Sequence, residues 1–147
     1  MTGPAKNPSL NFVNPIHAEL QCHAIVAAVG RGEHLVAVEQ PELHLHPRVQ
    51  AALGDLFIEA IHKKKNCFII ETHSEHLILR LLRRIRETEV HKAPTDRTLR
   101  TDDLAIYYMR QENGTSQALK IDVDVKGEFI QPWPDDFFEI DFFERFS

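Results

Sequence analysis

The sequence predicts an α/β fold, in which short apolar strands alternate with amphipathic helices. Two apolar runs, Leu35–Val38 and Cys67–Ile70, each end in a glutamate, and each is followed by apolar residues at helical spacing. This alternation is typical of a parallel sheet covered by helices, so we expect both strands to be buried on both faces. The dipeptide Asn113-Gly114 between two β-rich runs predicts a β-hairpin. The expected fold is therefore a buried, mainly parallel sheet flanked by helices and followed by a C-terminal β-hairpin.

The first half of the chain is predicted to hold a tail, two helices and the first strand. Residues 1–14 contain prolines without any apolar period and predict a tail. Apolar residues at helical spacing predict a helix over 15–29, before Gly30 and Gly32. After the strand at 35–38, a second apolar stripe begins at Val49 and predicts a helix that ends near Lys63.

The second half is predicted to hold a strand, a helix and the hairpin. Ser74 follows the strand at 67–70 and can cap a helix whose buried stripe is Ile78, Leu81, Leu82 and Ile85, with Arg80, Arg83, Arg84 and Glu87 on its other face. Polar, aperiodic residues 88–101 predict a mobile loop. The hairpin strands are expected at Leu104–Met109 and Ala118–Val123. The last stretch, 127–147, contains six of the nine phenylalanines among many carboxylates, and a short helix is expected over 135–145.

Length and composition favour one folded globular domain. The chain has 147 residues, of which 43% are hydrophobic and 27% charged. No apolar run reaches the roughly 20 residues of a membrane span, and residues 1–14 lack the pattern of a signal peptide, so we expect a cytoplasmic protein without membrane contact. Cys22 and Cys67 lie in apolar surroundings, which favours buried, reduced thiols over a disulfide.

The charge is unevenly distributed along the chain. The formal net charge of −5 argues against a generic nucleic-acid binder. Residues 62–86 nevertheless carry a net charge of +5, whereas residues 122–147 carry −6. The basic region is therefore a possible contact for nucleic acid, and the simpler interpretation is two solvated faces of opposite charge.

The ends of the two predicted strands carry the residues of chemical interest. Glu39 follows the first strand directly, and a carboxylate there needs a charged or hydrogen-bonded partner such as Mg²⁺ on a nucleotide phosphate. The second strand leads into Glu71-Thr72-His73-Ser74, where His73 can donate a hydrogen bond to a terminal phosphate. Taken singly, each motif also fits a structural role, with Glu39 half exposed and Ser74 acting as a helix cap beside a solvated His73.

Together these motifs resemble a known family. The segment Val38–Pro47 looks like the Walker B strand and D-loop of an ABC-type ATPase, and Glu71–Glu75 looks like its switch-histidine loop. The sequences of these motifs are most similar to those of bacterial SMC/OLD-like AAA ATPases. The segment Gly127–Phe138 resembles the Trp-Pro/Phe-Phe closing segment of one subgroup. The resemblance covers roughly residues 13–138. It implies a P-loop NTPase-like (ABC-type) lobe at 15–126, after a tail at 1–14 and before an acidic, Phe-rich closing segment at 127–147.

The resemblance also implies roles for individual residues, with Mg²⁺ and ATP as cofactors. Glu39 would act on Mg²⁺ directly or through water, and His73 would sense the γ-phosphate. His46 would belong to the D-loop at the nucleotide of an opposite subunit. Gln40 stands where many relatives carry the glutamate that polarises the attacking water. An amide orients water but does not accept its proton, which argues against rapid hydrolysis.

One element of the family is missing from this sequence. No Gly-x-x-x-x-Gly-Lys-Ser/Thr occurs in the 147 residues, and residues 13–19 do not show the family's signature motif. We therefore expect the C-terminal half of an ATPase, inactive alone, which hydrolyses ATP with a Walker A-containing half or as a homo- or heterodimer. The alternative is a non-catalytic interaction module that binds a partner ATPase or nucleic acid.

The histidines allow a further interpretation. His44 and His46 lie two residues apart, and Glu71, His73 and His76 lie at the end of the neighbouring strand. Such a set could form a transition-metal site. No Cys or Asp completes it, and nine histidines in one chain cluster easily by chance.

Overall fold

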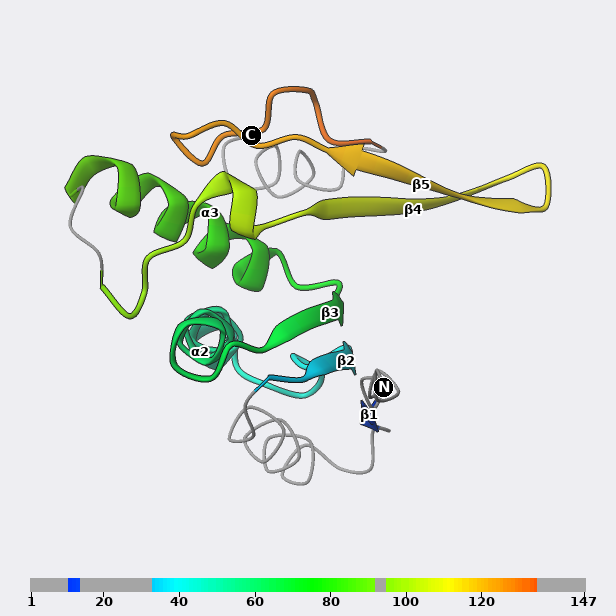
Figure 1. Ribbon diagram of the computed structural model, residues 1–147. Helices are drawn as coiled ribbons and strands as arrows, with labels where there is room; N and C mark the ends of the chain where they lie inside the picture. The colour runs from blue at the N-terminus through cyan, green and yellow to red at the C-terminus, as the bar shows by residue number, and fades with distance from the viewer. Residues whose placement is uncertain (1–10, 14–32, 92–94, 135–147) are drawn as a thin grey trace, which may run out of the picture. The chain divides into compact units, whose positions relative to one another are not determined.

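The protein is described by a computed structural model over residues 11–13, 33–91 and 95–134 (Figure 1). The helix at 15–29, Cys22, the short helix at 135–145 and most of the expected tail lie outside the described residues. The tail prediction is wrong for residues 11–13, which form a strand of the sheet. The chain groups into two compact units, Met1–Arg80 and Leu81–Ser147. No helix in the described part of the chain combines the length and the apolar character that crossing a bilayer requires.

The first unit contains a small parallel sheet. Its strands are β1 (Asn11–Val13), β2 (Leu35–Glu39) and β3 (Cys67–Glu71), in the order β1-β2-β3. Both pairings are parallel, as the alternation of strands and helices predicted. Val36 and Val38 of β2 lie on the same face of the strand and are buried. Figure 1 shows the three strands side by side.

Helix α2 (Pro47–Lys64) connects β2 to β3 and covers the face of the sheet that carries Val36 and Val38. Its buried stripe includes Leu53, Phe57 and Ala60, and the Phe57 ring lies 5.0 Å from the ring of Phe68 in β3. The predicted helix and its end near Lys63 are confirmed. Apolar contact between one helix face and one sheet face supplies the main stabilisation of this unit.

Both ends of α2 are capped. At its start, Nδ1 of His46 accepts a hydrogen bond from the backbone N–H of Arg48 at 3.2 Å, and Pro47 occupies the first helical position. At its end, Lys65 adopts a left-handed conformation with φ of 55°, and its N–H donates to the carbonyl of Ile61 at 3.0 Å. Three basic residues in the last turn suit the negative end of the helix dipole.

Strand β3 is less buried than the sequence suggests. It is the edge strand of the described sheet, and its residues Cys67, Ile69 and Glu71 are exposed, with Ile69 at 58%. The prediction of a strand buried on both faces is therefore wrong for β3 in the described part of the chain. A short apolar run does not reveal which of its faces is covered. Cys67 is a free, exposed thiol and not the buried one expected.

Helix α3 (Glu75–His91) begins as predicted. The hydroxyl of Ser74 accepts a hydrogen bond from the backbone N–H of Leu77 at 3.1 Å, which is an N-cap. Along the helix, Ile78, Leu82 and Ile85 are buried, as expected of its apolar stripe, and Leu81 is half-buried. The helix continues to His91, so the first residues of the predicted loop at 88–101 are helical.

The second unit contains the predicted hairpin. After a short 3-10 helix, η1 (Thr101–Asp103), strands β4 (Ile106–Glu112) and β5 (Thr115–Ile121) pair antiparallel. Asn113 and Gly114 both have positive φ, 51° and 77°, which matches the twist of a two-residue hairpin turn. Strand β4 begins and ends later than predicted, and β5 begins and ends earlier, so both strands run up to the turn. The turn itself is at the expected dipeptide.

Residues after the hairpin pack in the same unit through aromatic rings and one glycine. Trp133 is buried, and its ring lies 5.0 Å from that of Phe129 and 6.2 Å from that of Tyr108. Gly127 has φ of 70°, and a Cβ built there would overlap with the carbonyl oxygen of Leu82 in α3. Only glycine therefore fits between this turn and the helix.

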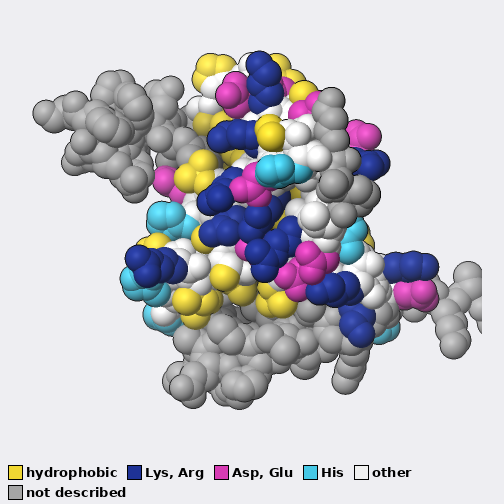
Figure 2. Space-filling view, turned by 90° about the vertical axis from the view of Figure 1, so that its left-hand side faces the viewer, with side chains coloured by type: hydrophobic (Ala, Val, Ile, Leu, Met, Phe, Trp, Pro, Cys, Tyr) yellow, Lys and Arg dark blue, Asp and Glu magenta, His cyan; other side chains and the backbone are white. Residues whose placement is uncertain are grey.

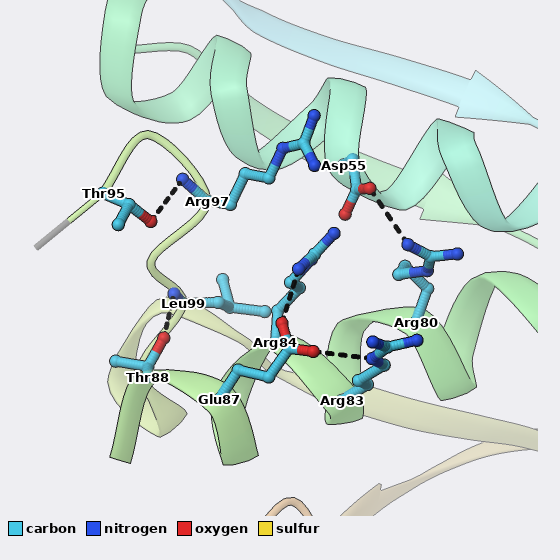
Figure 3. A network of polar contacts seen from close by, with 9 residues as sticks. All are labelled: Asp55, Arg80, Arg83, Arg84, Glu87, Thr88, Thr95, Arg97 and Leu99. Carbon is cyan, nitrogen blue, oxygen red and sulfur yellow. Dashed lines mark hydrogen bonds and ion pairs between the residues drawn. The ribbon is translucent and has the colours of Figure 1, made fainter. Parts of the chain in front are cut away.

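The predicted basic face of α3 is present, and its cations are paired. In the second unit, Nε of Arg83 donates to the Glu87 carboxylate at 2.7 Å, and Arg84 binds the other oxygen of the same carboxylate (Figure 3). The hydrogen bond from Arg83 lowers the pKa of Glu87, an effect opposed by partial burial and reinforced by Arg84. In the first unit, Arg80 is paired with Asp55 of α2 at 3.1 Å.

Candidate functional site

The two strand ends singled out by the sequence lie together in the first unit. Glu39 and Glu71 are partners in the register of β2 and β3, so their side chains leave the same face of the sheet at its carboxyl-terminal edge. Both residues are exposed. One residue further on, the backbone N–H of Gln40 donates to the carbonyl oxygen of Glu71 at 2.7 Å. The parallel ladder therefore extends past the end of β2.

The chain turns sharply after Gln40. The N–H of Leu43 donates to the carbonyl of Gln40 at 3.1 Å, and the N–H of Leu45 donates to the carbonyl of Glu42 at 3.0 Å. Gln40 and His44 both have positive φ, 43° and 63°, which costs a residue other than glycine about 1–3 kcal/mol. Strained residues of this kind gather where a site demands a particular backbone path.

The turn places Glu42 against the segment that follows β3. One oxygen of the Glu42 carboxylate, Oε1, accepts a hydrogen bond from the backbone N–H of His73 at 2.8 Å. The two residues are 31 positions apart in the sequence. Glu42 is buried, whereas the His73 side chain is exposed. The buried Glu42 carboxylate therefore fixes the backbone of His73, while the His73 imidazole faces solvent.

A second link joins the same segment to the start of α2. The hydroxyl of Ser74 donates to Oε1 of Gln50 at 2.7 Å, and Nε2 of Gln50 donates to the carbonyl of Leu45 at 2.9 Å. The N–H of Ser74 also donates to Oγ1 of Thr72 at 3.0 Å. The segment Thr72–Ser74 is thus bound both to the turn after β2 and to α2.

Three of the four candidate residues gather at this edge. Glu39 and Gln40 end β2, and His73 is tied to the same turn through Glu42. The fourth, His46, lies at the start of α2, where its Nδ1 caps the helix. Its hydrogen bond thus goes to its own helix and not to either strand end.

The transition-metal site that the histidines allowed as an alternative is not found in the described residues. In the described residues, no group of three or more His, Cys, Asp or Glu side chains is placed to hold a metal ion. The histidine cluster of His44, His46, Glu71, His73 and His76 is therefore set aside.

The exposed carboxylates fit Mg²⁺ better. Magnesium in phosphate-binding sites is held by one or two carboxylates, with phosphate oxygens and water completing its shell. Glu39 and Glu71 offer such oxygens at one edge, and neither makes an ion pair with a described residue. In the residues around them we find nothing equivalent to a glycine-rich phosphate cradle.

Sequence reasoning missed two residues of the site, Glu42 and Gln50. Both act through long-range hydrogen bonds that no local pattern encodes. The sequence carried no signal for Glu42, because an acidic residue in a turn is ordinarily exposed and its burial appears only in the structure. Gln50 stands in the first turn of α2 and resembles any polar helix residue.

The basic region at 62–86 is partly neutralised by ion pairs. Four of its seven Lys or Arg side chains are in ion pairs, including Lys63 with Glu59 at 3.2 Å and Arg80 with Asp55. Arg86 instead donates to the carbonyl of Lys126 at 2.9 Å. Figure 2 accordingly shows Asp and Glu side chains next to Lys and Arg. Charges already paired within the protein attract a polyanion less strongly.

Comparison with known proteins gave a match to one family model, over part of the chain. Residues 23–78 match the family model described as AAA ATPase domain. That segment contains β2, α2 and β3 together with both strand-end motifs. Neither the curated proteins nor the solved structures gave a match. A domain of this family implies the use of a nucleotide, usually with Mg²⁺. The α/β architecture and the matched segment together support an AAA-type ATPase fragment, with an ATPase-related function in general.

Proposed function

We propose that this chain is a partial ATPase lobe of the ABC-type, SMC/OLD-like kind. It supplies the Walker B residue Glu39, the D-loop residue His46 and the switch residue His73 to a Mg-ATP site. A Walker A-containing half, from a partner chain or from sequence outside the 147 residues, completes that site. The observation that carries the proposal is the joining of the two strand ends through Glu42 and His73, inside the segment that matches an AAA ATPase domain.

Each residue has a defined task in this proposal. Glu39 provides carboxylate oxygens for Mg²⁺, which when bound neutralises charge on the phosphates. The exposed imidazole of His73 donates a hydrogen bond to the terminal phosphate. The amide of Gln40 orients the attacking water but does not take its proton, so turnover is slow. Phosphoryl transfer depends mostly on positioning and charge stabilisation, which groups fixed on strand ends provide.

The outer edge of β3 supports the need for a second half. The hydrogen bonds from Cys67 to the carbonyl of His34 and from Gln40 to the carbonyl of Glu71 direct Cys67 and Glu71 toward β2. By the alternation of a parallel ladder, Phe68 and Ile70 direct their N–H and carbonyl groups to the opposite edge. Strand β3 contains no proline, and its one charged residue, Glu71, stands at its carboxyl end. An apolar edge that has no partner strand among the described residues suits a strand of the other half.

The first test measures the thermal midpoint of the purified chain with and without Mg-ATP. A ligand at about 100 times its dissociation constant raises stability by roughly 2.7 kcal/mol. We expect no change for the chain alone, because the phosphate cradle is absent. A rise that Glu39→Ala removes would mean that the lobe binds nucleotide by itself and that the proposal of a partial site is wrong.

The second test seeks the completed enzyme. Affinity capture should recover a protein with a Walker A sequence, and the purified complex should hydrolyse ATP. Glu39→Ala and His73→Ala should each abolish that hydrolysis while leaving the complex intact. Ile69→Lys should weaken assembly, because it places a charge on the exposed face of β3, and Leu79→Lys on the exposed face of α3 is the matched control.

A second candidate is a non-catalytic interaction module, favoured by Gln40 in place of a carboxylate. In that case the lobe would retain the shape of an ATPase while binding a partner ATPase or nucleic acid. The complex would then form equally well with Glu39→Ala and without nucleotide, and no ATP would be hydrolysed. Recovery of partners without a Walker A sequence, unaffected by ATP, would favour this candidate.

A further inference from the structure

Glu42 has an environment that its neighbours in the turn do not share. The residues on either side of the turn, Glu39 and His44, are exposed, whereas Glu42 is 8% exposed. A carboxylate removed from water is costly unless hydrogen bonds replace its hydration. Oε1 accepts from the N–H of His73, but Oε2 is buried without a hydrogen-bond partner among the described residues. Stability alone gives little reason to keep a carboxylate here.

The surrounding backbone is built to bring Glu42 inward. Pro41 is fully buried, and the strained residues Gln40 and His44 stand on either side of the turn. Two successive hydrogen bonds, to the carbonyls of Gln40 and Glu42, close the turn. This path directs the Glu42 carboxylate at the segment after β3, at the cost of two unfavourable backbone conformations.

We propose that Glu42 is a positioning residue, which fixes the backbone of His73 relative to the end of β2. This inference rests on the proposed function. Gln40 is bonded to Glu71, and Glu42 is bonded to His73, so the two strand-end motifs are joined at two successive points. These two bonds fix the backbone of His73, the proposed hydrogen-bond donor to phosphate, relative to the backbone of Glu39, the candidate metal ligand. A hydrogen bond from a backbone N–H to a carboxylate is charge-assisted and stronger than a neutral one.

The contact itself is tested on the chain alone, by hydrogen exchange of the His73 amide measured by NMR. Glu42→Ala should speed this exchange about tenfold or more, because the N–H loses its acceptor. Glu42→Asp should behave in the same way, since its carboxylate is one methylene too short to reach. Glu42→Gln retains an oxygen at Oε1 and should restore most of the protection. The amide of Val38 in β2 is the internal reference for global unfolding.

Two results would overturn the contact. One is unchanged exchange at His73 in Glu42→Ala, and the other is exchange in Glu42→Gln as fast as in Glu42→Ala. If Glu42→Ala also speeds exchange at Val38, this variant unfolds globally more often. The contact is then judged by comparing the exchange rate of the His73 amide in Glu42→Gln with that in wild type. No nucleotide is present, so these results are independent of the ATPase proposal.

The positioning role is tested in the assembled ATPase. Glu42→Ala should lower kcat about 10- to 100-fold with little change in the KM for ATP. The reason is that a displaced His73 imidazole donates a weaker hydrogen bond to the phosphate in the transition state. Glu42→Gln should recover most of kcat. A raised KM with unchanged kcat, or no recovery in Glu42→Gln, would contradict the role of Glu42. Absence of hydrolysis in the wild-type complex would instead contradict the proposed function and leave the contact standing.

Discussion

The backbone N–H of Gln40 donates to the carbonyl oxygen of Glu71 at 2.7 Å, one residue past the end of β2. This bond holds a residue with positive φ at the point where the resemblance expects a catalytic glutamate. The side chain of Gln40 therefore starts from a fixed backbone position beside Glu39. Activation of the attacking water at this position therefore depends on whether residue 40 carries an amide or a carboxylate.

We expect Gln40→Glu to accelerate hydrolysis in the assembled ATPase. A carboxylate accepts the proton of the attacking water, and general-base catalysis of this kind contributes about 10²- to 10⁴-fold. Steady-state turnover of the complex measures the effect. Gln40→Ala is the control and should be slower than wild type. Equal rates for Gln40→Glu and wild type would show that water activation is not limited by this residue.

Lys65→Gly should stabilise the protein. Lys65 ends α2 with φ of 55°, a conformation that glycine adopts without strain, and the expected gain is about 0.5–1 kcal/mol. Urea unfolding followed by circular dichroism measures it. Lys64→Gly is the matched control one residue earlier, where glycine lies within the helix and should destabilise by about 1 kcal/mol. Destabilisation by Lys65→Gly would argue against the left-handed cap.

Gly127→Ala should destabilise the second unit strongly. A Cβ at residue 127 would overlap with the carbonyl oxygen of Leu82, so the loop or the helix must move. Gly114→Ala is the matched control, because Gly114 also has positive φ but has nothing within 4 Å of its Cβ position. We expect about 1 kcal/mol for Gly114→Ala from backbone strain alone. Gly127→Ala should exceed this by about 2 kcal/mol or more in thermal unfolding.

Glu87 should make stability depend on pH. Its pKa is lowered below the ordinary 4.5, chiefly by the hydrogen bond from Arg83, so the folded state favours the ionised form. The resulting stabilisation is present above pH 4.5 and is lost as the pH falls through the lowered pKa.

The test compares the free energies of unfolding of wild type and Glu87→Gln. Because the pair is partly exposed, we expect a loss of about 0.5–1 kcal/mol at pH 7 that shrinks toward zero near the acid limit. Glu89→Gln on the exposed part of the same helix is the control and should cost less at pH 7. A loss in Glu87→Gln that persists at low pH would mean that packing, and not charge, is responsible.

Local pattern was sufficient for most of the described elements. The apolar period of α2, the Ser74 cap of α3 and the Asn113-Gly114 turn each depend on neighbours within a few residues, and each is found where expected. The placement of Glu39 and His73 at one sheet edge was also predicted. It follows from parallel pairing alone, since the carboxyl ends of parallel strands share an edge.

Burial and long-range bonding were not predictable in this way. The apolar runs of β2 and β3 look alike in sequence, yet β2 is central and β3 is at the edge of the described sheet, with Cys67 exposed. Whether a strand has neighbours on both sides is a property of the assembled sheet. The histidines likewise looked like a ligand set, but no group of three or more such side chains in the described residues is placed to hold a metal ion.

From its sequence alone, this protein is an α/β chain with two acidic strand ends and no glycine-rich phosphate loop. These properties follow from residue order, because helix and strand periods, caps and turns act over a few residues. Folding adds the hydrogen bond between Glu42 and His73, which joins residues 31 positions apart. It also adds the fit of Gly127 against Leu82. Such contacts exist only once distant segments are packed, because their energy depends on geometry that no local stretch of sequence contains.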